Sequence, residues 1–316
     1  MIDPTPRPLP ETWRRPRVEF PLPGWKGVLF GLPFVGVGAL IALVLAPRVR
    51  PGNEAPREWL AAIGAVFFAG GATFIVSALR PVWRARRRVR LLALHRAEPW
   101  RADFAWDRRG IGGDAGRQAR GAFVAFAGMG TFLSVFAYLA FHLDPAREGR
   151  PVWILRGVVA FFGLALIFVL GQALRLLARR LEYGPGYLHF GRFPFLLGET
   201  ADVRLASPRH ARRLRELGVT LRCVEERIER SKRDGDTTIS VVRWQLWADD
   251  RSVPATDLAG GGLALSFDLP ADPRFGTDLS ATPPRYWELS VAGEAPGMDW
   301  ASTFLVPVYA PAEQAR

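Results

Sequence analysis

The sequence predicts an α+β membrane protein in which four transmembrane helices are followed by an antiparallel β-sandwich domain. Four long apolar stretches lie between Gly27 and Leu174, whereas the chain after Arg180 alternates short apolar and polar runs. Charge divides at the same place: residues 1–180 contain 26 Lys and Arg against 11 Asp and Glu, and residues 181–316 contain 16 against 19. The basic character of the chain therefore belongs to the apolar part, which argues against nucleic acid as its partner.

The apolar stretches have the length of transmembrane helices. The first, GVLFGLPFVGVGALIALVLA, has twenty residues without a charge, and about 20 residues cross a hydrocarbon core of about 30 Å. It is too long for a cleaved signal peptide. Arg156 interrupts only the last stretch, one turn from its start, where a long side chain can reach the interface. The expected spans are 27–46, 59–79, 121–141 and 152–174.

The distribution of basic residues predicts the orientation. Five Lys and Arg precede the first span and twelve lie in 80–120, against three in 47–58 and two in 144–151. Because loops rich in Lys and Arg stay on the cytoplasmic side, both termini are expected there, including the tail 1–26.

The stretch RPVWRARRRVR at residues 80–90 is expected to lie at the cytoplasmic membrane surface, where anionic headgroups attract basic side chains. An acidic partner protein and nucleic acid are the alternatives. The membrane-surface residues are Arg84, Arg86, Arg87, Arg88 and Arg90.

The second span carries a ridge of small residues at every fourth position: Ala61, Ala65, Ala69, Thr73 and Ser77. Such a ridge lets another helix approach closely, either within the chain or in a homo-oligomer through Ala61, Ala65 and Ala69. The predicted spans contain no Asp, Glu or Lys, which disfavours an ion-coupled transporter.

The loop 80–120 is expected to extend the second helix to about Arg96 and to break at Glu98-Pro99. EPWRADFAW follows, with the aromatic residues Trp100, Phe104 and Trp106. They form a docking patch for the C-terminal domain or another protein, or they anchor the loop beside the bilayer; the sequence slightly favours anchoring. GIGGDA, further on, follows Asp-Arg-Arg rather than a strand, so a dinucleotide site is not expected.

Residues 181–316 show strand patterns. GYLHFG opens the series, and 219–228 and 238–248 flank a hairpin turn at Asp234-Gly235. Further strands are expected at 263–269, 286–292 and 300–308, and a helix only within SPRHARRLREL. The segment is expected to fold alone in water, with the hairpin at 230–237 as its contact region.

EPWRADFAW together with RYWELSVAGEAPGMDWASTFLVPVYA resembles bacterial membrane proteins of the family called domain of unknown function 3592. The W-x-L-x-V pattern of the terminal strands resembles an arrestin-type sandwich. The resemblance implies a multi-pass protein of the bacterial inner membrane and supplies no catalytic residue.

No catalytic, cofactor-binding or metal site is predicted. Cys223 is the single cysteine, four His are scattered, and nucleophile-elbow, P-loop and zincin motifs are missing. We therefore expect a non-enzymatic protein whose β-sandwich binds or organises a protein partner at an anionic membrane. A channel or transporter component and a membrane enzyme with an unrecognised site are the alternatives.

Overall fold

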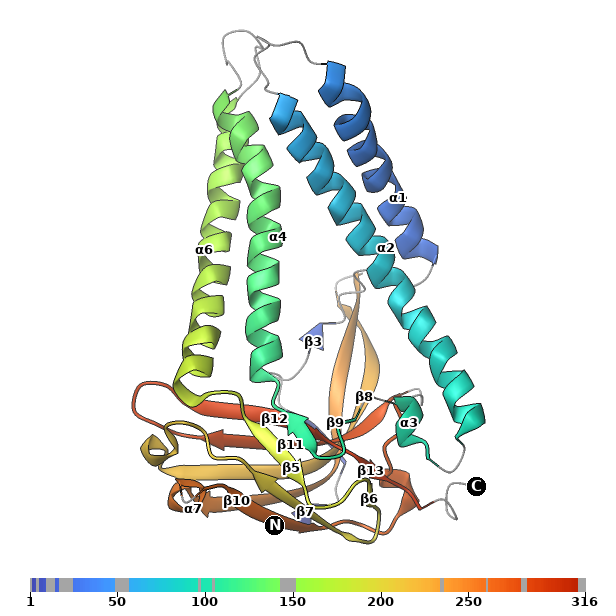
Figure 1. Ribbon diagram of the computed structural model, residues 1–316, viewed down its shortest axis with the longest axis vertical. Helices are drawn as coiled ribbons and strands as arrows, with labels where there is room; N and C mark the ends of the chain where they lie inside the picture. Colours follow the sequence, from blue (N-terminus) through green and yellow to red (C-terminus); the bar gives the residue numbers. More distant parts are fainter. Residues whose placement is uncertain are drawn as a thin grey trace. The chain divides into compact units, whose positions relative to one another are not determined.

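The computed structural model combines long α-helices with antiparallel sheets (Figure 1). It describes residues 2–3, 6–9, 15–16, 25–48, 57–95, 98–103, 106–142, 152–233, 236–259, 261–279 and 283–311. The chain forms two compact units. The helical unit comprises Val18–Arg87 and Gly121–Ala173, and the β-rich unit comprises Met1–Arg17, Arg88–Arg120 and Leu174–Arg316.

Among the described residues, four helices are long and apolar enough to span a membrane. They are α1 (Trp25–Leu40), α2 (Arg57–Leu94), α4 (Ala115–His142) and α6 (Val152–Tyr183). A π-helical turn (Ile41–Leu45) and a 3-10 turn (Ala46–Arg48) continue α1. Each predicted span lies inside one of these helical segments, and α2 continues to Leu94, close to the end expected from the sequence.

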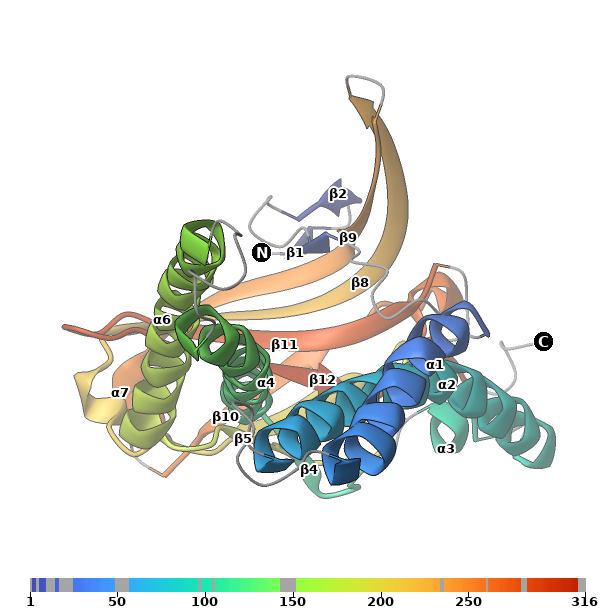
Figure 2. The same cartoon turned by 90° about the horizontal axis from the view of Figure 1, so that it is seen from above.

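Helices α1 and α2 lie side by side because glycines let their backbones touch (Figures 1 and 2). A Cβ atom added at Gly38 would lie 2.4 Å from the backbone nitrogen of Phe68, and one added at Gly71 would lie 2.7 Å from the carbonyl oxygen of Gly31. Gly64 meets the carbonyl oxygen of Gly38 in the same way. The glycines are seven residues apart on each helix, a spacing that keeps two antiparallel helices in contact over successive turns.

The small-residue ridge of α2 does not form this contact. Ala65, Ala69 and Thr73 are exposed, and Ala61 and Ser77 are half-buried. Of the two predicted uses of the ridge, packing within the chain is therefore not seen against α1. The reason is that Gly64 and Gly71, on another face of α2, allow a closer approach than alanine does. A homo-oligomer through Ala61, Ala65 and Ala69 stays a prediction.

The β-rich unit contains a seven-stranded sheet, a four-stranded sheet and a parallel pair. The seven-stranded sheet has the order β1-β9-β8-β11-β12, with β2 and β3 also pairing with β9. Its strands are β1 (Ile2–Asp3), β2 (Arg7–Pro8), β3 (Arg15–Pro16), β8 (Glu216–Arg233), β9 (Asp236–Pro254), β11 (Arg285–Gly293) and β12 (Trp300–Val306).

The four-stranded sheet has the order β10-β7-β5-β4. Its strands are β4 (Gly110–Gly112), β5 (Tyr187–Phe190), β7 (Thr200–Leu205) and β10 (Leu263–Asp268). The parallel pair joins β6 (Phe195–Leu196) to β13 (Val308–Tyr309). Two short helices, α3 (Trp100–Asp103) and α7 (Ala255–Ala259), complete the elements named in Figure 1.

Alternating apolar residues of both larger sheets share one core. Trp287, Leu289 and Val291 of β11 are fully buried, and Leu263, Leu265 and Phe267 of β10 belong to the same cluster. The period of two puts every second side chain on the same face of a strand. The strands expected from 219–228, 238–248, 263–269, 286–292 and 300–308 are confirmed in type, although β8 and β9 are longer than predicted.

The β-rich unit is larger than the segment 181–316 in which the sequence predicts a separate domain. Strand β4 from the loop pairs with β5, and β1, β2 and β3 from the N-terminal tail pair with β9. The helix considered within SPRHARRLREL is wrong, since only a 3-10 turn forms at Ala211–Arg213 before β8 begins. The turn at Asp234-Gly235 lies outside the described residues.

Replacing Gly38 with valine is expected to lower the free energy of unfolding of the helical unit by about 1–3 kcal/mol, because the added side chain meets backbone atoms that cannot move aside. Helical circular dichroism of the full chain in detergent, followed through denaturation, measures this loss. Gly36→Val is the matched control, since a Cβ there has nothing within 4 Å. Equal unfolding of the two variants would contradict the glycine contact.

Candidate functional site

The single cysteine is buried in the core of the β-rich unit. The Cys223 thiol lies in the core, 3.4 Å from the carbonyl oxygen of Phe275, and burial raises its pKa well above the usual range. The thiol therefore stays neutral and packs as a small apolar group. Within the described part of the chain, no three His, Cys, Asp or Glu side chains are placed to hold a metal ion.

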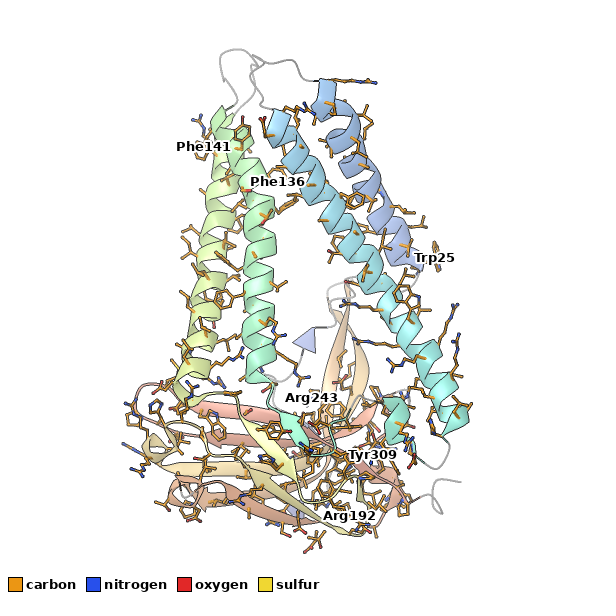
Figure 3. The ribbon with its side chains drawn as sticks, in the orientation of Figure 1. Trp25, Phe136, Phe141, Arg192, Arg243 and Tyr309 are labelled. Carbon is orange, nitrogen blue, oxygen red and sulfur yellow. The ribbon has the colours of Figure 1, made fainter. Side chains whose placement is uncertain are left out.

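Two cavities differ in chemistry. The first, of about 430 Å³, lies between α4 and α6 and has an almost wholly apolar lining. Its lining residues are Met129, Phe132, Leu133, Phe136, Val158, Phe162 and Leu166; Phe136 is labelled in Figure 3. It offers no charged group to orient a ligand. The second cavity, of about 640 Å³, has a mixed lining that includes charged and hydroxyl side chains, and it lies within the β-rich unit.

The second cavity, called here the sheet pocket, lies on the outer face of the seven-stranded sheet. Tyr286, Glu288 and Ser290 point to it from β11, because their neighbours Trp287 and Leu289 point to the core. The remaining lining residues are Asp114, Arg117, Gln118, Arg179, Glu226, Arg243, Leu279, Ala292, Ala301, Ser302, Thr303 and Leu305.

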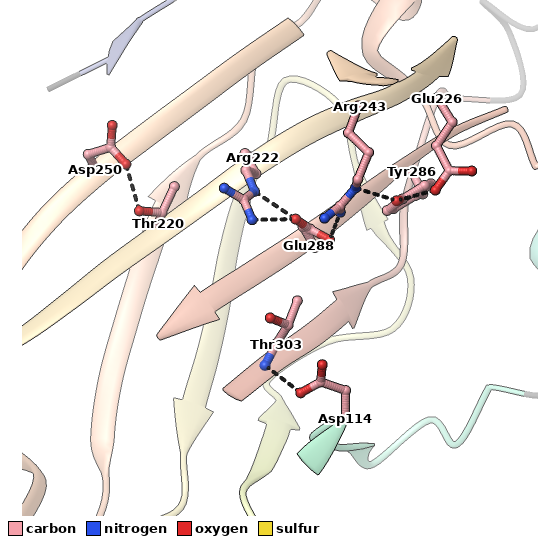
Figure 4. Close-up of polar contacts among 9 residues, drawn as sticks. All are labelled: Asp114, Thr220, Arg222, Glu226, Arg243, Asp250, Tyr286, Glu288 and Thr303. Carbon is pink, nitrogen blue, oxygen red and sulfur yellow. Dashed lines mark hydrogen bonds and ion pairs between the residues drawn. The ribbon is translucent and has the colours of Figure 1, made fainter. Parts of the chain in front are cut away.

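A buried carboxylate joins three strands at the floor of the sheet pocket (Figure 4). Glu288 accepts from Arg222, its cross-strand neighbour on β8, whose Nε and Nη2 lie 2.7 and 2.6 Å from Oε1. Its other oxygen pairs with Nη2 of Arg243 on β9. All three side chains are less than 10% exposed. The two guanidinium groups compensate the buried carboxylate, whereas any of the three side chains alone would be costly.

The sequence carried a signal for this cluster that the strand pattern alone does not interpret. Arg222, Arg243 and Glu288 each stand between two apolar residues within a strand. A charged residue on the outer face of a strand is ordinarily solvated. Only the register, which places Arg222 opposite Glu288, makes them a buried pair.

Tyr286 extends the cluster. Its hydroxyl accepts from Nε of Arg243 at 3.1 Å and donates to Oε1 of Glu226 at 2.8 Å. Burial raises the pKa of Tyr286 well above its usual range, so the phenol keeps its proton and acts as a donor. The hydroxyl thus links the guanidinium of Arg243 to the carboxylate of Glu226 through two hydrogen bonds.

The first turn of α4 and the last turn of α6 form the wall of the sheet pocket. Asp114 accepts from the backbone N–H of Thr303 at 3.1 Å and from the side-chain amide of Gln118 at 2.5 Å. Arg179 donates from Nη2 to the carbonyl oxygen of Ala301 at 3.0 Å. Both contacts fix the wall to β12 (Figure 4 shows the Asp114 contact).

The aromatic residues of the loop meet the C-terminal strand. The ring centroids of Trp100 and Tyr309 lie 5.8 Å apart, and Nε1 of Trp106 donates to the hydroxyl of Tyr309 at 3.2 Å; Tyr309 is labelled in Figure 3. The two tryptophans therefore pack against the protein, which differs from the interfacial anchoring that the sequence favours. The spacing of aromatic residues in the sequence is the same whether they pack against protein or lie at the membrane interface. Phe104 lies outside the described residues.

Arg88 belongs to the same cluster. It pairs with the buried Asp103, and Asp278 lies 3.6 Å from its Nη2. Burial raises the pKa of Asp103, an effect that Arg88 and a hydrogen bond from Tyr309 oppose. Among the predicted membrane-surface residues, Arg88 thus faces acidic groups of its own chain. The others, Arg84, Arg86, Arg87 and Arg90, are exposed.

The GIGGDA stretch, residues 110–115, follows a turn at Asp-Arg-Arg, as expected from its sequence, and its first three residues form a strand themselves. Gly110–Gly112 form β4, and α4 begins at Ala115. The turn between them has no room for a pyrophosphate, because a Cβ at Gly113 would lie 2.1 Å from the hydroxyl oxygen of Ser302. The glycine here allows close packing against β12.

The hairpin of β8 and β9 projects beyond the strand beside it (Figure 2). Strand β11 pairs with β8 only from Leu217 to Glu225, and one further backbone bond joins Glu226 to Pro284. From Arg227 to Arg233, β8 pairs with β9 alone among the described residues. Within the described part of the chain, one edge of β8 therefore has no strand partner over these positions, and this is called here the open edge.

The chain has little similarity to known proteins. It matches no family model and no curated protein. Among solved structures it is similar to Spo0M, a sporulation control protein from Bacillus subtilis, with 10% identity and a TM-score of 0.21. The match covers 39% of this chain and 48% of that chain, so it spans about half the length of Spo0M.

Replacing Glu288 with glutamine is expected to lower the free energy of unfolding of the β-rich unit by about 3–5 kcal/mol, because Arg222 and Arg243 lose the charge that compensates them. Tryptophan fluorescence of the full chain during denaturation reports the change, since Trp247 and Trp287 lie 5.0 Å apart in the core. Glu294→Gln, at an exposed position, should change the stability by less than about 0.5 kcal/mol. Similar stabilities for the two variants would show that the ion pairs contribute little.

Proposed function

We propose that this protein is a non-enzymatic integral membrane protein of the bacterial inner membrane, with both termini in the cytoplasm. Its two larger sheets are proposed to form an arrestin-like β-sandwich that binds a protein partner at the membrane surface. The observation that carries this proposal is the open edge of β8 in the projecting hairpin.

The membrane part of the proposal is supported by two independent features. Four helices are long and apolar enough to cross a bilayer, and the basic residues concentrate before the first helix and between the second and the third. That distribution supports a cytoplasmic location for the loop 80–120 and the β-rich unit. The shared core of the two larger sheets supports the sandwich.

An open strand edge is suited to binding an extended peptide. Backbone N–H and C=O groups at such an edge can hydrogen-bond to an extended segment of a partner, which then becomes an additional strand. Contacts with neighbouring side chains determine which partner sequences fit. Beside this edge, the guanidinium of Arg227 lies 4.4 Å from the ring centroid of Trp244, and Nε of Arg227 is 2.7 Å from Glu225. Charged residues along an edge also limit pairing with unrelated chains. The hairpin therefore combines an open backbone with selective side chains.

Binding accounts for the titratable groups better than catalysis does. Glu288, Arg222 and Arg243 compensate one another, and the hydroxyl of Tyr286 is held between Arg243 and Glu226. A general acid or base needs a proton-transfer path to a substrate. These groups instead tie strands together, which supports a structural role.

The orientation predicts opposite locations for two reporter fusions. A fusion after Asn53, between the first two helices, should be periplasmic, and one after Arg316 should be cytoplasmic, because of the uneven distribution of Lys and Arg. Alkaline phosphatase and green fluorescent protein activities distinguish the two sides. A periplasmic C-terminus would overturn the proposed location of the β-rich unit.

A photo-crosslinking amino acid at Arg230, in the projecting hairpin, is expected to capture one discrete protein in native membranes. Replacing residues 230–239 with Asn-Gly should strongly reduce crosslinking to a probe placed at Arg227, because only Arg227 to Glu229 of the open edge remain. The same probe at Thr256, an exposed residue of α7, is the matched control. Identical adducts from Arg230 and Thr256, or undiminished adducts at Arg227 after the shortening, would contradict binding by the hairpin. The fluorescence of the core tryptophans verifies that the shortened chain is folded.

A further inference from the structure

The sheet pocket has a use that differs from partner binding by the hairpin. With a volume of about 640 Å³ it has the size of a small-molecule site. Its lining holds three arginines, Arg117, Arg179 and Arg243, together with the hydroxyls of Ser290 and Thr303. Its chemistry is decided by which of its charged groups are already engaged.

The carboxylates of the sheet pocket are engaged by the protein itself. Glu288 pairs with Arg222 and Arg243, and Glu226 accepts from Tyr286. Asp114 accepts from a backbone N–H and from Gln118. Three acidic side chains are thus supplied with donors, and a cation would have to displace these donors to reach them.

Two arginines of the sheet pocket, in contrast, have hydrogen-bond donors that the described residues do not occupy. Arg179 is anchored by its bond to Ala301, and its Nε is buried without a hydrogen-bond partner among the described residues. Arg117, in the first turn of α4, is exposed and forms no ion pair within the described part of the chain. Unsatisfied buried donors are costly, and two guanidinium groups at one cavity favour an anion with several oxygen acceptors.

We propose that the sheet pocket binds a phosphate group through Arg117 and Arg179. The planar guanidinium matches the oxygens of a phosphate in a bidentate manner. Arg179 supplies a fixed donor, and Arg117 closes over the bound group from the exposed side. The phosphate belongs either to an anionic lipid headgroup or to a soluble compound, since both present the same chemistry.

The test compares two double variants of the full-length protein in detergent. Arg117→Gln/Arg179→Gln removes the proposed donors. Arg120→Gln/Arg175→Gln removes the same charge from exposed positions of α4 and α6 that do not line the sheet pocket. The probes are dioctanoyl phosphatidic acid, inorganic phosphate and dioctanoylglycerol, which lacks the phosphate. Titration calorimetry measures their binding.

Phosphatidic acid is expected to bind at least about 10-fold more weakly to the Arg117/Arg179 variant, because a charged hydrogen bond contributes about this factor or more. The Arg120/Arg175 variant should bind like the unaltered protein, and dioctanoylglycerol should not bind. Displacement of the lipid by inorganic phosphate would assign a soluble phosphate, and failure to displace it would assign a headgroup. Equal weakening in both variants, or binding of neither phosphate probe, overturns the proposal.

The single variant Arg117→Gln guards against misfolding, because Arg117 is exposed and its loss leaves the anchor of Arg179 intact. It should weaken phosphatidic acid severalfold while tryptophan fluorescence shows a native core; unchanged binding would count against the proposal. The phosphate site does not require the hairpin, so the chain shortened at 230–239 should still bind the lipid. Failure of one proposal is therefore distinguishable from failure of the other.

Discussion

Three strands of the larger sheet are held by one carboxylate that has been removed from water. Glu288 on β11 pairs with Arg222 on β8 and Arg243 on β9, so a shift in the register of any strand would separate buried charges. The desolvation cost of an unpaired ion is several kcal/mol, which exceeds the gain from most alternative contacts. This constraint fixes the outer face of the sheet. The cluster also holds Tyr286 through Arg243, and it forms the floor of the sheet pocket.

The helical unit depends on the opposite principle, close contact without charge. Gly31, Gly38, Gly64 and Gly71 bring two backbones together where a larger side chain could not fit. Dispersion forces between closely packed backbones stabilise this contact, as they do between helices in a bilayer, where the hydrophobic effect is weak. The chain thus uses glycine in one unit and compensated charge in the other.

Much of this fold is predictable from local patterns. The helices were recognisable because apolar runs of about twenty residues have few other uses, and the strands around Trp287 and Phe304 because the period of two continues through each strand. The face of α2 that contacts α1 could not be recognised from the sequence. The ridge from Ala61 to Ser77 has a spacing that is typical of helix interfaces, yet the contact is formed by Gly64 and Gly71. Which face is buried depends on the partner helix.

The candidate site was less predictable, because it is made of long-range pairs. Arg222 and Glu288 are neighbours only through the strand register, and Arg179 reaches Ala301 across more than a hundred residues. The roles of Trp100 and Trp106 likewise depend on Tyr309, near the other end of the chain. Local sequence identifies the side chains but not their surroundings.

The β-rich unit is assembled from three separated segments of the chain, and this affects when it can form. Arg7 pairs with Gln245, and Gly110 pairs with His189, so both early segments are synthesised well before their partners. Contacts so distant in sequence form slowly, and unpaired strands are prone to association until they are covered. During synthesis, the N-terminal tail therefore cannot pair until β9 has been made, and the loop cannot pair until β5 has been made. The residues of α1, α2, α4 and α6 are all synthesised before the strands β8, β9, β11 and β12 of the seven-stranded sheet.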